Sequence, residues 1–124
     1  MRKEMFTIQG ELPDLNTIIK ESKRGRGNWQ PYNDLKHEHT IRVMAACRGI
    51  KPFNKINVGI EWICKEKRKD KDNVMAGTKF ILDGLVSEGV LTNDGWGQIG
   101  DITHSFYIDK LNPRINVVLT EVEV

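Results

Sequence analysis

The segment INVGIEWIC, residues 56–64, constrains the fold of this chain more than any other stretch. Apolar residues alternate along it with residues that would point to the opposite face, which predicts a half-buried strand. The strand runs directly into the charged segment KEKRKDKD, residues 65–72, and then into a helical pattern over residues 73–88. In that helix, Asp72 or Asn73 is suited to the N-cap, and Gly89 is suited to ending it. A strand that leads into an amphipathic helix favours a fold that mixes helices with a sheet.

The remaining segments complete an α+β pattern. Residues 5–9 alternate and predict a first strand. Residues 12–30 contain Pro, Asn and Gly and predict a long basic loop, and a helix is expected from Asn33 or Asp34 to about residue 47. Residues 99–108 and 114–120 are expected to form a final antiparallel hairpin. The sequence therefore predicts one small domain over residues 1–124, with a mixed, mostly antiparallel sheet, two main helices and the order β-α-β-α-β-β.

Composition fits a globular protein without a membrane span. The 124 residues suit a single domain, and the contents of 39% hydrophobic and 29% charged residues are those of a folded chain. The apolar runs are too short to cross a bilayer, and the first residues, MRKEMFTIQGEL, lack the apolar core of a secretory signal. We therefore expect a cytoplasmic protein. Cys47 and Cys64 form no zinc-type spacing, so reduced thiols are expected.

Basic residues are concentrated in two clusters although the net charge is only +2. Residues 65–71 hold five bases and two acids, and residues 20–26 hold four bases and one acid. Either cluster alone could be a solvated surface, but two together suggest a face for a polyanion such as DNA. The expected phosphate contacts are Lys23, Arg24, Arg26, Lys65, Lys67, Arg68, Lys69 and Lys71.

Two acids stand inside the second cluster. Asp70 and Asp72 are two residues apart after a strand, so their carboxylates would point to one side and repel each other unless a cation lies between them. Mg²⁺ needs only one or two protein carboxylates, with water and substrate phosphate completing its shell. An EF-hand loop starting at Asp70 is excluded because Met75 and Ile81 occupy its Gly and Glu positions.

Three further charged residues follow along the chain. Lys79 and Asp83 would share a helix face with Asp72, although a Lys79–Asp83 pair alone is an ordinary exposed ion pair. Asp94 lies in the polar turn TNDGWG and could return beside the helix, although by itself it is an ordinary turn aspartate.

In combination, these residues resemble the RusA family of Holliday junction resolvases. The matching pattern is Asp70-Lys71-Asp72-Asn73, Lys79, then FILDGL from Phe80 to Leu85, Gly89 and Asn93-Asp94. The resemblance implies a homodimeric, Mg²⁺-dependent endonuclease, with Mn²⁺ able to substitute, that cuts four-way DNA junctions. It implies metal ligation by Asp70, Asp72 and Asp94, a catalytic role for these acids and Lys79, and a supporting role for Asn73 and Asp83.

Two other hypotheses fit the same residues. The chain could be a branched-DNA-binding module without catalysis, or a small interaction protein whose acids pair with its lysines. His37 and His39 are two apart on a predicted helix, so they would not share a metal, and they are expected at the surface. Trp29 and Trp96 could stack on an opened base, but each is more often a core residue.

Overall fold

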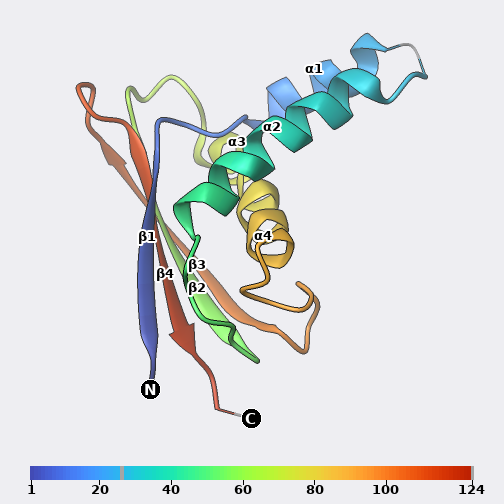
Figure 1. Ribbon diagram of the computed structural model, residues 1–124. Coiled ribbons are helices and arrows are strands. Elements are labelled where there is room, and N and C mark those ends of the chain that lie inside the picture. Colours follow the sequence, from blue (N-terminus) through green and yellow to red (C-terminus); the bar gives the residue numbers. More distant parts are fainter. Residues whose placement is uncertain (26, 124) are drawn as a thin grey trace.

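The computed structural model describes residues 1–25 and 27–123, and it shows helices packed on one face of a single sheet (Figure 1). The predicted classes occur in the predicted order, with one additional helix before the first predicted one, and with the second predicted helix divided in two. In chain order the elements are β1 (Lys3–Gln9), α1 (Leu15–Arg24), α2 (Gln30–Ala46), β2 (Ile56–Cys64), α3 (Lys71–Met75), α4 (Thr78–Ser87), β3 (Ile99–Ile108) and β4 (Arg114–Glu121).

The four strands lie in the order β1-β4-β2-β3. β4 pairs antiparallel with both β1 and β2, whereas β2 and β3 are parallel, with Cys64 opposite Ile108. The predicted hairpin of β3 with β4 is therefore wrong, because β2 lies between them. Parallel neighbours need a crossover connection, and here α3 and α4 supply it. The β2–α3–α4–β3 unit thus places the end of β2 and the start of β3 at opposite ends of the sheet.

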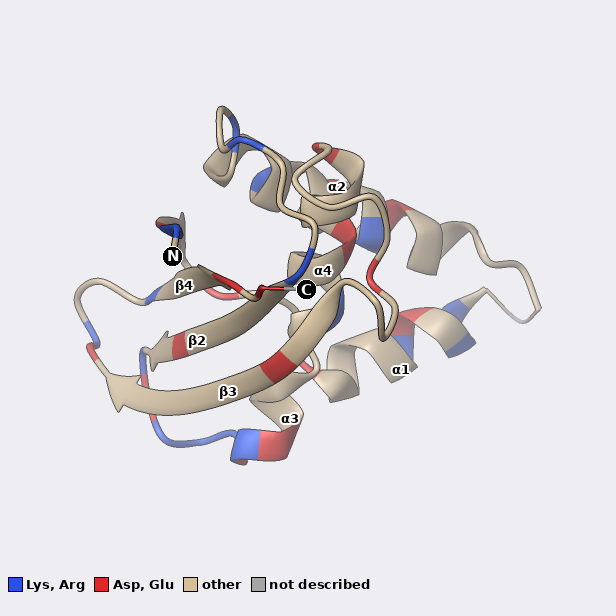
Figure 2. Cartoon of the chain, turned by 90° about the horizontal axis from the view of Figure 1, so that it is seen from below, with Lys and Arg blue, Asp and Glu red and all other residues tan. Residues whose placement is uncertain are grey.

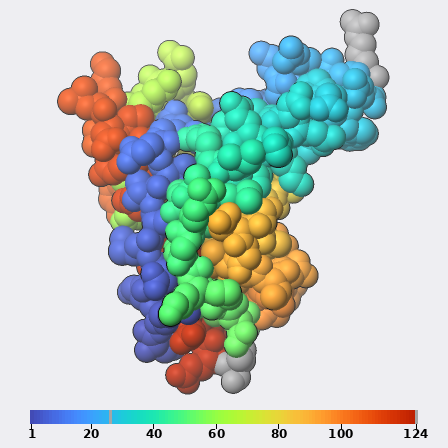
Figure 3. Space-filling model, viewed as in Figure 1, coloured from blue at the N-terminus to red at the C-terminus, as the bar shows by residue number. Residues whose placement is uncertain are grey.

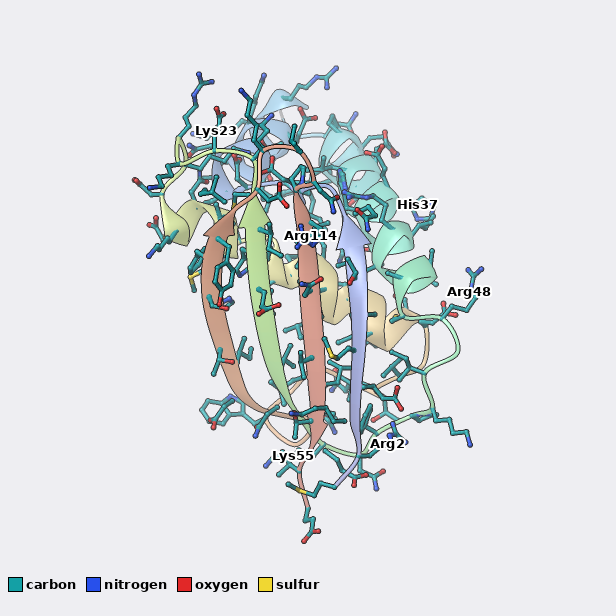
Figure 4. All side chains as sticks on the ribbon, turned by 90° about the vertical axis from the view of Figure 1, so that its left-hand side faces the viewer. Arg2, Lys23, His37, Arg48, Lys55 and Arg114 are labelled. Carbon is teal, nitrogen blue, oxygen red and sulfur yellow. The ribbon has the colours of Figure 1, made fainter. Side chains whose placement is uncertain are left out.

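The core forms where the inner face of the sheet meets α2 and α4. The predicted alternation along β2 is confirmed, since the side chains of Ile56, Val58, Ile60 and Trp62 are all buried. Val117 of β4 lies opposite Ile60 and is also buried. Figure 4 shows the other face of the sheet, which no described element covers.

The expected loop over residues 12–30 is wrong for most of its length, because it contains α1. Asp14 caps this helix by accepting a hydrogen bond from the Thr17 amide at 2.7 Å. Ile18 packs against the core, and Lys23 and Arg24 occupy the last turn, where they suit the helix dipole. α1 and α2 project together beyond the sheet (Figure 3).

The single helix expected over residues 73–88 is instead α3 and α4, with a turn at Ala76 and Gly77. A Cβ on Gly77 would lie 3.1 Å from Leu12 and 3.2 Å from Trp62, so this position packs tightly against the core. Gly84 lies still closer to Val43 of α2, since a Cβ on Gly84 would overlap the Val43 side chain. Both glycines therefore allow close packing that a larger residue would prevent. As predicted, α4 ends just before Gly89, which has φ +81°.

Both cysteines are free, as expected. Burial raises the pKa of the Cys47 thiol to about 11. None of the helices in residues 1–25 and 27–123 has the length and apolar character needed to cross a membrane.

Candidate nucleic-acid and metal site

An open groove lies where β2 ends and α3 begins. Its volume is about 680 Å³, and we call it the strand-end groove. One side is formed by the charged segment between β2 and α3, which Figure 2 shows as a run of basic residues leading to an acid on α3. The other side is formed by the last residues of β3. Its lining residues are Cys64, Glu66, Lys67, Lys69, Asp70, Lys71, Asp72, Val74, Phe106, Tyr107 and Ile108.

Asp70 and Asp72 both line this groove and both are exposed to solvent. Asp70 is the N-cap residue of α3, and Asp72 lies in its first turn, where its Oδ1 accepts a hydrogen bond from the Asn73 amide at 2.9 Å. Within residues 1–25 and 27–123, neither carboxylate has an ion-pair partner inside 4.0 Å. The structure therefore brings together two of the three predicted metal ligands.

The neighbouring bases are mostly engaged elsewhere. Lys69 pairs with Asp14 at 3.0 Å, Arg68 lies 3.8 Å from Glu66, and the Lys71 ammonium lies 5.4 Å from the centre of the Phe106 ring. All five predicted bases of this cluster are exposed: Lys65, Lys67, Arg68, Lys69 and Lys71. They form a basic surface around the two acids, rather than a set of ion pairs with them.

Asp14 ties this segment to the first helix. Burial alone would raise the pKa of Asp14, but the Thr17 amide and the Lys69 ammonium outweigh it and the net shift is downward. A second link is the hydrogen bond from the Asn16 amide to Asn73 Oδ1 at 3.1 Å. The predicted supporting residue Asn73 thus holds α3 against α1, beside the groove.

Lys79, Asp83 and Asp94 lie in a different place from the groove. Lys79 and Asp83 form the predicted pair on α4, 3.9 Å apart, and neither lines the strand-end groove. Asp94 precedes β3, so the parallel pairing of β2 with β3 places it at the opposite end of the sheet from Asp70 and Asp72. The described residues contain no group of three His, Cys, Asp or Glu side chains able to hold one metal ion. One chain does not assemble the three predicted ligands.

The N-terminal basic cluster is on a helix end rather than in a loop. Lys23 and Arg24 are exposed in the last turn of α1, and Arg24 pairs with Glu21 at 3.2 Å. Arg26, the third predicted base of this cluster, lies outside the described residues. In Figure 4, Lys23 stands at the same end of the molecule as Arg114 and opposite Lys55.

Several side chains at or near the site were not predicted from the sequence. Tyr107, 51% exposed on β3, gives the groove an aromatic wall, but only the strand register shows that β3 ends beside β2. The two tryptophans expected in the core are exposed instead, Trp29 by 63% and Trp96 by 97%. His104, which had no assigned role, accepts a hydrogen bond from Trp62 Nε1 at 2.9 Å.

The predicted surface histidines differ from one another. His37 is exposed, whereas His39 is half-buried and packs edge-on against Phe80, with ring centres 5.8 Å apart. Burial lowers the pKa of His39 most, and the nearby Arg42 guanidinium lowers it further, against an opposing effect of Glu38.

Comparison of the chain with models of known protein families and with curated proteins finds no match. The assignment of a function therefore depends on the site itself.

Proposed function

We propose that this protein is a Mg²⁺-dependent endodeoxyribonuclease that acts on branched DNA, with the four-way junction as substrate. The main support is the arrangement of Asp70 and Asp72, two exposed carboxylates on one wall of a groove surrounded by bases. Arg68 and Lys69 pair with acids other than these two, which argues against an interaction protein whose acids only neutralise its lysines.

The donor set of the groove fits a hard cation. Two carboxylates are as many as Mg²⁺ usually takes from a protein, and the groove is open enough for water and a phosphate to complete the shell. A bound Mg²⁺ would polarise the phosphoryl oxygens and supply hydroxide near neutral pH. Mn²⁺ has similar ligand preferences and is proposed to substitute.

The chain's own residues would hold the DNA. Lys67 and Lys71 line the groove and can contact phosphates on either side of the acids, without reading sequence. Tyr107 on the facing wall can stack on a base opened at the branch point. Lys23, Arg24 and Arg26 are proposed to contact a second DNA arm.

The homodimer and the catalytic roles of Lys79 and Asp94 are proposed on grounds other than the lining of the groove. A four-way junction has two-fold symmetry, so a homodimer with one groove per subunit could nick two related strands. A role of Lys79 and Asp94 in catalysis stays a prediction from the RusA resemblance, because in one chain they lie away from the groove. The cytoplasm is the proposed location.

The test is the isosteric variant Asp72→Asn. We expect it to lower Mg²⁺-dependent junction cleavage by at least about 100-fold, since it removes a ligand of the ion that stabilises the transition state. Junction binding measured in Ca²⁺ should be retained. The matched control is Asp101→Asn, which changes an exposed aspartate near the start of β3 and should leave cleavage unchanged.

Other outcomes would point to the alternatives. Junction binding without cleavage at any Mg²⁺ or Mn²⁺ concentration, in the unmodified protein, would favour a branched-DNA-binding module. Absence of any salt-sensitive binding to branched DNA would leave a non-enzymatic interaction protein.

A further inference from the structure

β3 forms one edge of the sheet, and its outer side has no partner strand among residues 1–25 and 27–123. The strand pairs only with β2, and Figure 4 shows it as the left-hand strand of the sheet. The Asp109 amide, just beyond β3, is directed toward β2, where it donates a hydrogen bond to the Cys64 carbonyl at 2.8 Å. Backbone groups alternate in direction along a strand, so the even-numbered residues in 102–108 direct their amides and carbonyls away from the sheet.

β3 lacks the features that normally protect an exposed edge. It has 10 residues, and its sequence, IGDITHSFYI, contains no Lys or Pro and only one charged residue, Asp101. Natural sheets usually protect an edge with Lys, Pro or a very short strand. The other edge strand, β1, carries Lys3 and Glu4. The β3 edge is therefore suited to pairing with a further strand.

Two exposed apolar side chains flank β3 at its two ends. Trp96, 97% exposed, precedes the strand, and Leu111, 94% exposed, follows it. A hollow of about 210 Å³ lies beside Trp96, and it is lined by Asp94, Gly95, Trp96, Ile99 and Gly100. Side chains at opposite ends of one edge strand are brought together when a second copy of that strand runs beside it in the reverse direction.

We infer that the β3 edge binds the β3 edge of a second copy of this chain, in an antiparallel pair with a two-fold axis at His104. The start of each strand then lies beside the end of the other. Trp96 therefore meets Leu111 of the second copy, and the hollow beside Trp96 can receive that leucine. The inference rests on the proposed function in that it names the surface of the proposed homodimer.

The sequence of β3 is complementary to itself in this register. Ile102 lies opposite Phe106 of the second copy, which pairs a β-branched with an aromatic side chain. Thr103 lies opposite Ser105, and their hydroxyls can share a hydrogen bond. Cross-strand pairs of both kinds stabilise antiparallel strands.

Charge and side-chain size favour this register over its neighbours. Asp101 lies opposite the uncharged Tyr107 of the second copy. A shift of two residues in one direction would bring Asp101 opposite Asp109, where like charges repel. A shift of two residues in the other direction would place Phe106 opposite Gly100, which has no side chain to pack against.

This pairing also arranges the two strand-end grooves. The end of β3 forms one wall of each groove, so each groove would lie beside the residues that precede β3 in the second copy. The two-fold axis is perpendicular to the sheet, because both strands belong to one continuous sheet. Both grooves therefore face the same side, as nicking two strands of one junction requires.

Sedimentation equilibrium of the full chain, without DNA or metal, tests the inference. We expect a dimer whose dissociation constant rises at least about 10-fold in Trp96→Ala and in Leu111→Asp. Both side chains are almost fully exposed, so the fold should be retained, which circular dichroism checks. Met5→Ala, at a 64% exposed position on β1, is the matched control and should leave the constant unchanged. A monomer at every concentration, or equal dissociation constants in all variants, would overturn the inference.

Cross-linking tests the strand pairing itself. Thr103 of one copy and Ser105 of the other form a non-hydrogen-bonded pair, whose Cα atoms lie about 4.5 Å apart. Thr103→Cys/Ser105→Cys in a Cys64→Ser background should therefore form disulfide-linked dimers with oxidised glutathione. Thr120→Cys on β4, in the same background, is the control and should stay unlinked. A dimer in solution that does not cross-link at positions 103 and 105 would overturn the pairing. Failure of the nuclease proposal would appear separately, as a cross-linkable dimer that does not cut a four-way junction.

Discussion

The carboxylate of Asp14 lies 3.0 Å from the ammonium of Lys69, and the same carboxylate caps α1. One buried acid therefore joins the first helix to the segment that carries Asp70 and Asp72. Because Lys69 lies next to Asp70, this pair fixes the basic segment against the body of the protein. We infer that the groove depends on it for its shape.

Replacing Asp14 by Asn should keep the helix cap and remove the ion pair, because Asn caps helices about as well as Asp. We expect the free energy of unfolding at neutral pH to fall by about 1 kcal/mol, a value reduced for the partial exposure of Lys69. Denaturant unfolding measures this. The control is Glu21→Gln, which breaks an exposed pair with Arg24 and should cost at most about 0.5 kcal/mol.

The same pair has a pH signature. The pKa of Asp14 is lower in the folded protein than its ordinary value of 3.8. Its stabilising contribution is therefore complete above 3.8 and is lost as the pH falls through the lower folded pKa. Unmodified protein should lose more stability than Asp14→Asn in this acidic range. If stability fell equally with pH in the two proteins, the acid loss of stability could not be assigned to Asp14.

Lys67 is expected to contact a phosphate without influencing sequence preference. Lys67→Ala should weaken binding to every branched DNA tested and reduce the slope of log K against log salt by about 1. Fluorescence anisotropy at several salt concentrations measures the slope. Lys55→Ala, at the other end of the sheet (Figure 4), should leave the slope unchanged. Equal slopes for both variants would argue that the strand-end groove does not bind DNA.

His104 should make stability depend on pH in a second range. Burial lowers its pKa below the ordinary 6.5, and its Nδ1 accepts the Trp62 hydrogen bond only when that nitrogen is unprotonated. The contribution of neutral His104 to stability is therefore fully present above pH 6.5 and declines as the pH falls toward the folded pKa. Urea unfolding at about pH 7.5 and about pH 5 should show a smaller decline for His104→Gln than for unmodified protein. His37→Gln, an exposed position, should match the unmodified protein.

Close packing of α2 against α4 depends on Gly84. A Cβ at this position would lie 2.5 Å from Val43 Cβ, so the helices would have to move apart. We expect Gly84→Ala to destabilise the protein by about 1–3 kcal/mol, despite the higher helix propensity of Ala. Thermal unfolding measures this. Gly97→Ala, whose Cβ would meet no atom within 4 Å, is the control. A Gly84→Ala protein as stable as the control would contradict the packing.

The sequence predicted the local features of this fold better than the long-range ones. The bounds of β2 follow from its alternation, because a residue's burial there depends on its place in the pleat. α1 was not predicted, because Pro, Gly and Asn in residues 12–30 favour a loop, although Asp14 is a good N-cap residue. Strand order could not be predicted, since nothing local shows that β4 inserts between β1 and β2.

The same difference between local and long-range features explains which residues of the candidate site could be placed together from the sequence. Asp70 and Asp72 are close in the sequence, so their shared position in the groove could be predicted. Asp94 is about twenty residues away, and its place depends on the direction in which β3 runs. A parallel β3 starts at the far end of the sheet, and Asp94 therefore lies near Asp83 and Thr40 rather than near Asp72.

Nuclease activity is measured directly by incubating the unmodified protein with a four-way junction labelled on each strand in turn, with and without Mg²⁺. We expect symmetrically paired nicks in two opposing strands that require the metal, and no cleavage of linear duplex. Intact strands at every Mg²⁺ and Mn²⁺ concentration, with the junction demonstrably bound, would contradict it.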